Sequence, residues 1–113
     1  MPLVSIYTSA TIADSAPILK IVTERAASIL GKPESIMMVR IEDEQNMSFG
    51  GASDTPATLF EIDGIELSDE KAEPLTLECC RLAGELFATS QDRVFVKLTN
   101  VPRGMWGGNG KVY

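Results

Sequence analysis

Hydrophobic and polar residues follow two different spacings along the chain, and the two spacings alternate. Leu3–Thr8 is rich in strand-forming side chains and Met37–Glu42 alternates apolar and polar residues, so both segments are predicted strands. Between them, apolar residues recur at every third or fourth position, which predicts an amphipathic helix. These residues are Ile18, Ile21, Val22, Ala26 and Ile29. Arg25 interrupts the apolar stripe, so we expect it at the edge of the stripe, with its charge in water.

The ends of this predicted helix carry residues that commonly start and stop helices. Asp14, Ser15 and Pro17 precede the apolar stripe and favour a helix start. Gly31 follows the stripe as a candidate C-cap, and Pro33 cannot continue a helix. The first half of the chain therefore predicts strand, helix, strand.

The second half of the chain repeats this order. Ala57–Ile62 predicts a strand, Asp63–Gly64 a turn, and Val94–Leu98 a last strand. Ser68 is a candidate cap for a second helix. Pro74 is costly inside a helix, so either the regular helix begins near Pro74 or its first turns are irregular. The residues on one face of this helix are Leu75, Cys79, Leu82 and Leu86.

Two strand–helix–strand units of similar length predict an α+β fold of one domain over residues 1–113. Its order is β-α-β-β-α-β, and we expect a four-stranded mixed sheet with both helices on one face. The opposite face of such a sheet needs a cover, and another subunit is the simplest one, so we expect an oligomer. The tail, Gly104–Tyr113, is rich in glycine and has Trp106 and Tyr113 as aromatic anchors.

Composition narrows the classes of partner. The chain has 113 residues with 10 Lys+Arg and 16 Asp+Glu, a net charge of −6. An acidic protein is a poor match for nucleic acid or an anionic membrane, so we predict neither as a partner. No apolar run approaches the ~20 residues of a membrane-spanning helix. Met1–Ser5 has no basic and apolar signal segment, so we expect a cytoplasmic protein.

The chain contains no histidine, which excludes histidine bases, histidine-containing triads and histidine-bound metals. Cys79 and Cys80 are the only cysteines, too few for a four-thiolate site, and we predict no metal and no cofactor. Proton transfer near pH 7 would therefore need a carboxylate, a lysine, a cysteine or the chain's own α-amine with a shifted pKa.

Five short segments, in order along essentially the whole chain, resemble the tautomerase superfamily, specifically the macrophage migration inhibitory factor group. The segments are Pro2 after the initiator Met, Gly31-Lys32-Pro33, Met47-Ser48-Phe49-Gly50-Gly51, Ser90-Gln91-Asp92-Arg93-Val94 and Gly107-Gly108-Asn109-Gly110. The resemblance implies a homotrimer and an isomerase, a keto–enol tautomerase of the phenylpyruvate type that acts on a small aromatic α-keto acid. It also leaves open release from the cell without a signal peptide.

The resemblance assigns roles to particular residues. It implies that Pro2 is the catalytic base, that Lys32 binds the substrate carboxylate and that the backbone N–H of Ile65 assists. An aromatic residue at position 95, here Phe95, would come from the neighbouring subunit, and Tyr113 would supply a C-terminal aromatic. A simpler interpretation of Lys32 is a solvated lysine near the end of a helix, and a simpler interpretation of Phe95 is a core residue.

The chain departs from the family pattern at several places. Phe95 stands where Tyr is common and Lys97 where Asn is common, although Lys97 has a simpler reading as a solvated residue. Gly108 stands where the family has a tail tryptophan, and Trp106 lies two residues earlier. The Cys-x-x-Cys pair of animal members is absent, so their redox activity is not transferred. These departures leave two alternatives: a binding or signalling trimer with low activity, or a tautomerase whose Lys97 favours dianionic substrates.

Pro2 would become a base once Met1 is removed, because its nitrogen is then a free secondary amine. The ordinary pKa of an α-amine is about 7.7–8.0. Partial burial and the charge of Lys32 would lower that pKa, and a neutral amine near pH 7 is a competent base. While Met1 is attached, the Pro2 nitrogen is an amide and cannot accept a proton.

Overall fold

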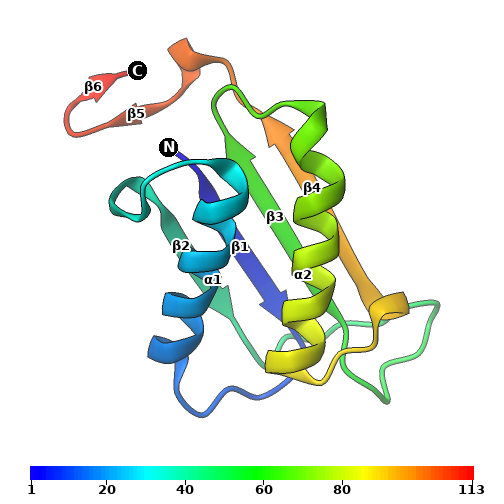
Figure 1. Cartoon of the computed structure of the whole chain (residues 1–113). Coiled ribbons are helices and arrows are strands. Elements are labelled where there is room, and N and C mark those ends of the chain that lie inside the picture. The colour runs from blue at the N-terminus through cyan, green and yellow to red at the C-terminus, as the bar shows by residue number, and fades with distance from the viewer.

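A four-stranded mixed sheet carries both long helices on one of its faces, as the sequence predicts (Figure 1). The computed structural model describes residues 1–113. The strands are β1 (Leu3–Thr8), β2 (Met38–Glu42), β3 (Thr58–Gly64) and β4 (Val94–Asn100), and the helices are α1 (Ser15–Leu30) and α2 (Ala72–Phe87). The strand order across the sheet is β2-β1-β3-β4.

The two halves of the chain meet at the centre of the sheet. β1 pairs parallel with β2, β3 pairs parallel with β4, and β1 pairs antiparallel with β3. The antiparallel register sets Leu3 opposite Asp63, so β1 begins at the same end of the sheet at which β3 finishes. This arrangement brings the N-terminus beside the segment that follows β3.

The core lies between the sheet and the two helices. Alternate residues of the central strands point into it, and the largest fully buried ones are Val4, Ile6, Phe60 and Ile62. The predicted apolar stripe of α2 faces them, with Leu75, Cys79 and Leu82 buried and Leu86 half-buried. Arg25 lies at the edge of the α1 stripe, and its guanidinium pairs with Glu78 at 3.6 Å and Glu85 at 3.5 Å on α2.

The predicted ends of α1 are confirmed. The Asp14 carboxylate accepts a hydrogen bond from the Ala16 N–H at 3.2 Å and caps the helix start. Gly31 takes the left-handed conformation with φ 66°, and its N–H donates to the Ala27 carbonyl. Lys32 follows directly, so this cap fixes the place at which Lys32 leaves the helix.

The start of α2 combines both expectations for Pro74. A 3₁₀ turn, Asp69–Lys71, precedes the regular helix, and Pro74 is the third residue of α2. In the first helical turn its missing N–H has no partner to lose. Ser68 makes no capping hydrogen bond with its side chain, so the prediction of a Ser68 cap is wrong. The helix begins through the 3₁₀ turn instead.

Two strands are longer than predicted because they extend each other. Gly64 pairs with Asn100, and the Gly64 carbonyl accepts a hydrogen bond from the Val101 N–H at 2.8 Å. Asp63–Gly64 therefore belongs to β3, and the turn follows at Ile65 and Glu66. Strand β2 in turn begins one residue later than predicted, after a 3₁₀ turn.

The tail forms a hairpin that the sequence analysis did not predict. β5 (Gly107–Gly108) pairs antiparallel with β6 (Lys111–Val112). Asn109 and Gly110 connect them with φ values of 52° and 76°, as a type I′ turn requires. An Asn-Gly pair is a strong hairpin signal, and it could have revealed this element.

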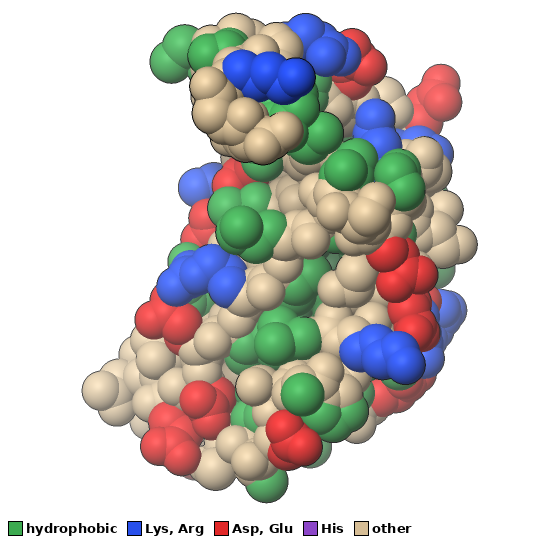
Figure 2. Space-filling model, turned by 90° about the vertical axis from the view of Figure 1, so that its left-hand side faces the viewer, with side chains coloured by type: hydrophobic (Ala, Val, Ile, Leu, Met, Phe, Trp, Pro, Cys, Tyr) green, Lys and Arg blue, Asp and Glu red, His purple; other side chains and the backbone are tan.

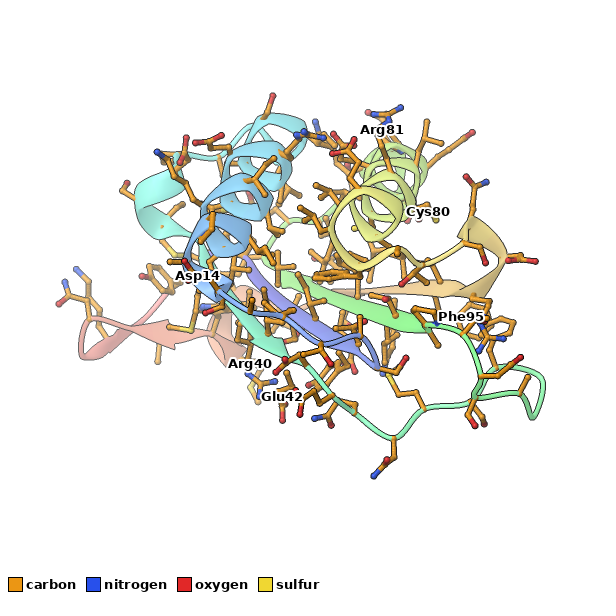
Figure 3. The ribbon with its side chains drawn as sticks, turned by 90° about the horizontal axis from the view of Figure 1, so that it is seen from below. Asp14, Arg40, Glu42, Cys80, Arg81 and Phe95 are labelled. Atoms are coloured by element: carbon orange, nitrogen blue, oxygen red, sulfur yellow. The ribbon has the colours of Figure 1, made fainter.

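The sheet face opposite the helices is open in the single chain. Figure 3 shows Arg40 and Glu42 on the side of the sheet away from the helices. In register across this face lie Arg40, Ser5, Glu61 and Lys97. The face also carries exposed apolar side chains, with Met38 and Phe95 each 66% exposed.

A chain of buried hydroxyls ties the two halves of the fold together. The Thr58 Oγ1 lies 3.0 Å from that of Thr8 on β1 and 2.9 Å from that of Thr89, which follows α2. All three side chains are buried, and Thr8 also donates to the Ala57 carbonyl at 3.3 Å. Buried polar groups are costly without partners, so this chain depends on all of its members.

We predict that Thr58→Val lowers the free energy of unfolding by about 1–3 kcal/mol, because it removes the middle partner of the buried chain. Urea denaturation followed by circular dichroism measures the loss. Thr76→Val, at an exposed position of α2, is the matched control and is expected to change stability by less than about 0.5 kcal/mol. Equal effects of the two substitutions would contradict a stabilising role for the buried chain.

Candidate active site

Pro2 lies at the end of the sheet where β1 begins and β3 finishes. Its side chain is buried, and its carbonyl accepts a hydrogen bond from the Met38 N–H at 3.1 Å. Met1 precedes it and is half-buried. The sheet therefore holds the Pro2 backbone in a fixed position, which is what a group that must be aimed at a ligand requires.

Two hollows of the protein surface adjoin at Pro2, and Met1 and Pro2 line both of them. The first hollow is also lined by Lys32. The second lies under the C-terminal hairpin, encloses about 370 Å³ and contains Trp106 and Tyr113. That volume falls in the range of ~300–1,000 Å³ typical of small-molecule sites. The hairpin projects as an overhang at the top of the molecule in Figure 2.

Lys32 is held beside the N-terminus by the end of α1. Its backbone N–H donates to the Ala27 carbonyl at 3.1 Å, next to the Gly31 cap. Partial burial and, second, the charge of Lys32 lower the pKa of the Met1 amine. Both effects favour the neutral amine. The surroundings of an amine at this end of the sheet therefore favour its neutral, basic form over its ammonium form.

Ile65 is buried and lines the first hollow together with Pro2. It is the first residue of the turn that follows β3, and this turn lies two residues later than the predicted turn at Asp63–Gly64. The pairing of β3 with β1 brings this turn to the start of β1. Ile65 thus contributes an apolar wall beside Pro2.

The hairpin explains the departure at Gly108. The Tyr113 N–H donates to the Trp106 carbonyl at 2.9 Å and closes the hairpin. A side chain at Gly108 would bring its Cβ within 3.0 Å of the Tyr113 hydroxyl oxygen and 3.1 Å of its ring. The Tyr113 ring therefore takes the space that a larger residue at position 108 would need.

Phe95 and Lys97 lie apart from this site within the single chain. Both are exposed on the open face of β4, and neither lines a hollow that contains Pro2. Phe95 instead packs against Phe49, with ring centroids 4.9 Å apart, and Figure 3 shows it at the far end of the sheet from the hairpin. Its interpretation as a residue of the chain's own core is therefore wrong.

Arg93 fixes the loop that contacts Phe95. Its guanidinium donates to the carbonyls of Pro56, Ala52 and Thr55 at 3.0 Å each, and it lies over the Phe49 ring at 5.9 Å. The Ala52 carbonyl also accepts from the Phe49 N–H at 2.9 Å, and the guanidinium gives the carbonyls of Thr55 and Pro56 a hydrogen-bond partner. These bonds tie the loop before β3 to the start of β4.

Two charged residues that the sequence analysis did not select also reach this end of the sheet. A third hollow contains Met1, Lys32, Glu66 and Arg103. Arg103 donates to the Glu66 carboxylate at 2.6 Å, and this contact, with its charge, holds the pKa of Glu66 below its usual range. Only the pairing of the ends of β3 and β4 brings these residues together, so no local signal could have shown it.

Cys79 does not offer a nucleophile. Burial first, then the neighbouring Cys80 and Glu78, raise the pKa of Cys79 to about 12, so it is a thiol at neutral pH. The structure brings no three histidine, cysteine, aspartate or glutamate side chains together in a way that could hold a metal ion.

No helix of this chain has both the length and the apolar character needed to cross a membrane.

Similar proteins share this architecture over nearly the whole chain. The structure resembles a macrophage migration inhibitory factor homologue from Prochlorococcus marinus with TM-score 0.92 and 26% identity, covering 97% of each chain. It also resembles a Leishmania major protein of this type with TM-score 0.87 and 22% identity, covering 100% of this chain and 97% of the other. A third, from Trichinella spiralis, has TM-score 0.88 and 20% identity and covers 98% and 99%.

The family model described as macrophage migration inhibitory factor matches residues 1–113. That match covers the whole chain, and it agrees with the strand and helix order that the sequence predicts. The chain therefore belongs to the macrophage migration inhibitory factor family, within the tautomerase superfamily.

Proposed function

We propose that this protein is a keto–enol tautomerase that acts on small aromatic α-keto acids, with the amine of Pro2 as its general base once Met1 is removed. One observation carries the proposal: the buried Pro2 lies beside Lys32, where hollows of the surface meet. Family membership supports an isomerase in general.

In the proposed reaction, a single proton changes position. The neutral Pro2 nitrogen takes a proton from the enol oxygen, or from the carbon next to the carbonyl, and returns it at the other position. The ammonium of Lys32 binds the substrate carboxylate and offsets the charge of the enolate. Ile65, Trp106 and Tyr113 line the hollows next to Pro2 and offer apolar surface to the aromatic ring.

The surroundings of the N-terminus support a base at Pro2. Burial and Lys32 already lower the pKa of the Met1 amine, although Met1 is only half-buried. Pro2 is held at the start of β1 beside Lys32, so after removal of Met1 the amine stays near the same positive charge. Its pKa is then expected below the ordinary α-amine value of about 7.7–8.0. A larger share of neutral amine near pH 7 follows, without any histidine.

We further propose that the working form is a homotrimer of this single domain. The open face of the sheet leaves Phe95 and Met38 largely exposed, and a second copy of the chain would cover them. A neighbouring copy could also bring Phe95 and Lys97 to the hollow at Pro2, which the chain cannot do alone. Relatives named as macrophage migration inhibitory factors share the fold that presents this face.

Substitution of the base tests the function most directly. We predict that Pro2→Ala lowers kcat/KM for phenylpyruvate ketonisation about 100-fold or more, because it replaces a fixed secondary amine with a mobile primary one. Mass spectrometry must first show that Met1 is absent from both proteins. Pro17→Ala, at the far end of α1, is the matched control and is expected to keep full activity. Undiminished activity of Pro2→Ala would overturn the assignment.

The pH profile tests the role of Lys32. We predict that kcat/KM rises with pH as the Pro2 amine loses its proton, with a midpoint below the ordinary α-amine pKa. Lys32→Gln removes a nearby positive charge that disfavours the ammonium, so the pKa and the midpoint should move upward. Its KM should also rise. Lys20→Gln, on an exposed position of α1, should leave the midpoint in place, and a profile that is equally unmoved in Lys32→Gln would refute the role.

The proposed assembly predicts a mass. Light scattering coupled to size-exclusion chromatography should give three times the mass of one chain, because the family resemblance implies three copies and the open face leaves Met38 and Phe95 to be covered. Phe95→Asp would place a charge in the covered face and should shift the mass toward that of one chain. A monomeric wild-type protein with full activity would show that Phe95 and Lys97 take no part in the site.

A second candidate function is a binding trimer with little turnover. The position of the Tyr113 ring over Gly108 favours it, because that ring reshapes the wall of the hollow next to Pro2. Trp106 is the only tryptophan of the chain and lines the same hollow, so its fluorescence reports a bound acid whether or not it reacts. Saturable binding of phenylpyruvate without turnover would favour this function over the tautomerase.

A further inference from the structure

Positive charge gathers around the N-terminus of an acidic protein. The chain has a net charge of −6, yet the hollows at Met1 are lined by three cations, Lys32, Lys71 and Arg103. Glu66 is the only acidic side chain that lines them. A ligand that enters these hollows therefore meets an excess of positive charge, which favours anions.

Arg103 and Glu66 are brought together by the strand ends behind them. Glu66 lies in the turn after β3 with φ 56°, and Arg103 begins the 3₁₀ turn Arg103–Met105 after β4. Two hydrogen bonds join these connections: the Val101 N–H to the Gly64 carbonyl at 2.8 Å, and the Leu67 N–H to the Asn100 side-chain oxygen at 3.0 Å. The backbone thus fixes the places from which both side chains extend.

The pair itself is exposed and free to exchange partners. The Arg103 side chain is 57% exposed and the Glu66 side chain 65% exposed. Ion pairs at such exposure contribute little to stability, so the fold does not depend on this contact. A guanidinium binds carboxylates through two parallel hydrogen bonds, and Glu66 now occupies one arm of that fork.

Lys32 links this pair to the reaction site. It lines the hollow at Pro2 and also the hollow that contains Glu66 and Arg103. Its charge acts on both the N-terminal amine and the Glu66 carboxylate, so it lies near both. One ligand could therefore reach the two cations from a single binding position, with one carboxylate at each.

We propose that Arg103 binds a second carboxylate of the substrate, and that Glu66 occupies Arg103 until such a substrate displaces it. The inference rests on the proposed function and names its substrate class: α-keto acids that carry a second, distal carboxylate. Lys32 binds the carboxylate next to the carbonyl, and Arg103 binds the distal one. The reaction is unchanged, since the same proton moves between oxygen and carbon and nothing else is consumed.

The experiment compares two substrates that differ by one carboxylate, phenylpyruvate and 4-carboxyphenylpyruvate. Arg103→Gln should lower the ratio of their kcat/KM values, carboxylated over plain, about tenfold or more, the usual effect of losing a charge-assisted hydrogen bond. Glu66→Gln should raise the same ratio, because it frees Arg103. Arg81→Gln is the matched control: the Arg81 side chain is 56% exposed, much as that of Arg103 is, and pairs with Glu78 on α2, away from the hollows, so its loss should leave the ratio unchanged (Figure 3).

The opposite signs of the two variants separate binding from general damage to the fold. A misfolded site would lower both activities in both variants and would not raise the ratio in Glu66→Gln. An unchanged ratio in Arg103→Gln overturns the inference, whatever Pro2→Ala does. If the wild type turns over neither substrate, the proposed function fails, and Trp106 fluorescence titrations with the same two acids still test Arg103. The inference about Arg103 would then be overturned if the wild type and Arg103→Gln each bound the two acids with equal affinity.

Discussion

The antiparallel pairing of β1 with β3 at the centre of the sheet is the constraint on which the rest of this protein depends. It turns the two strand–helix–strand halves head to tail, so that the start of β1 lies against the end of β3. Because β1 and β2 are parallel, α1 must return to the end of the sheet where both strands begin, and this return brings Lys32 there. Every feature of the candidate site follows: a buried Pro2, a cation beside it, and the Ile65 turn as its wall.

Local signals in the sequence were sufficient where local physics decides the structure. Asp14 and Gly31 mark the ends of α1 because their conformations and hydrogen bonds involve only neighbouring residues. The extension of β3 through Gly64 was not predictable in this way, because it depends on hydrogen bonds to β4. The C-terminal hairpin is a different case, since the Asn109–Gly110 turn carries a local signal from which this hairpin was predictable.

The predicted site residues fall into two groups, those that lie together within one chain and those that do not. Pro2, Lys32, Ile65, Trp106 and Tyr113 line hollows at one end of the sheet, and their roles in a reaction stay predictions. Phe95 and Lys97 point to the open face, as strand alternation requires, and only a neighbouring copy could bring them to such a hollow. Glu66 and Arg103 are 37 residues apart in the sequence, and only the paired strand ends bring their charges together.

The buried threonines have a property that no single residue encodes. Each hydroxyl carries one hydrogen, and that of Thr8 is committed to the Ala57 carbonyl. Thr8 must then accept from Thr58, and a Thr58–Thr89 hydrogen bond needs the single hydrogen of Thr89. The Phe87 carbonyl lies 3.4 Å from the same Thr89 hydroxyl and competes for that hydrogen. The core of this protein thus contains three hydroxyls whose hydrogens are shared between two backbone carbonyls, one just before β3 and one at the last residue of α2.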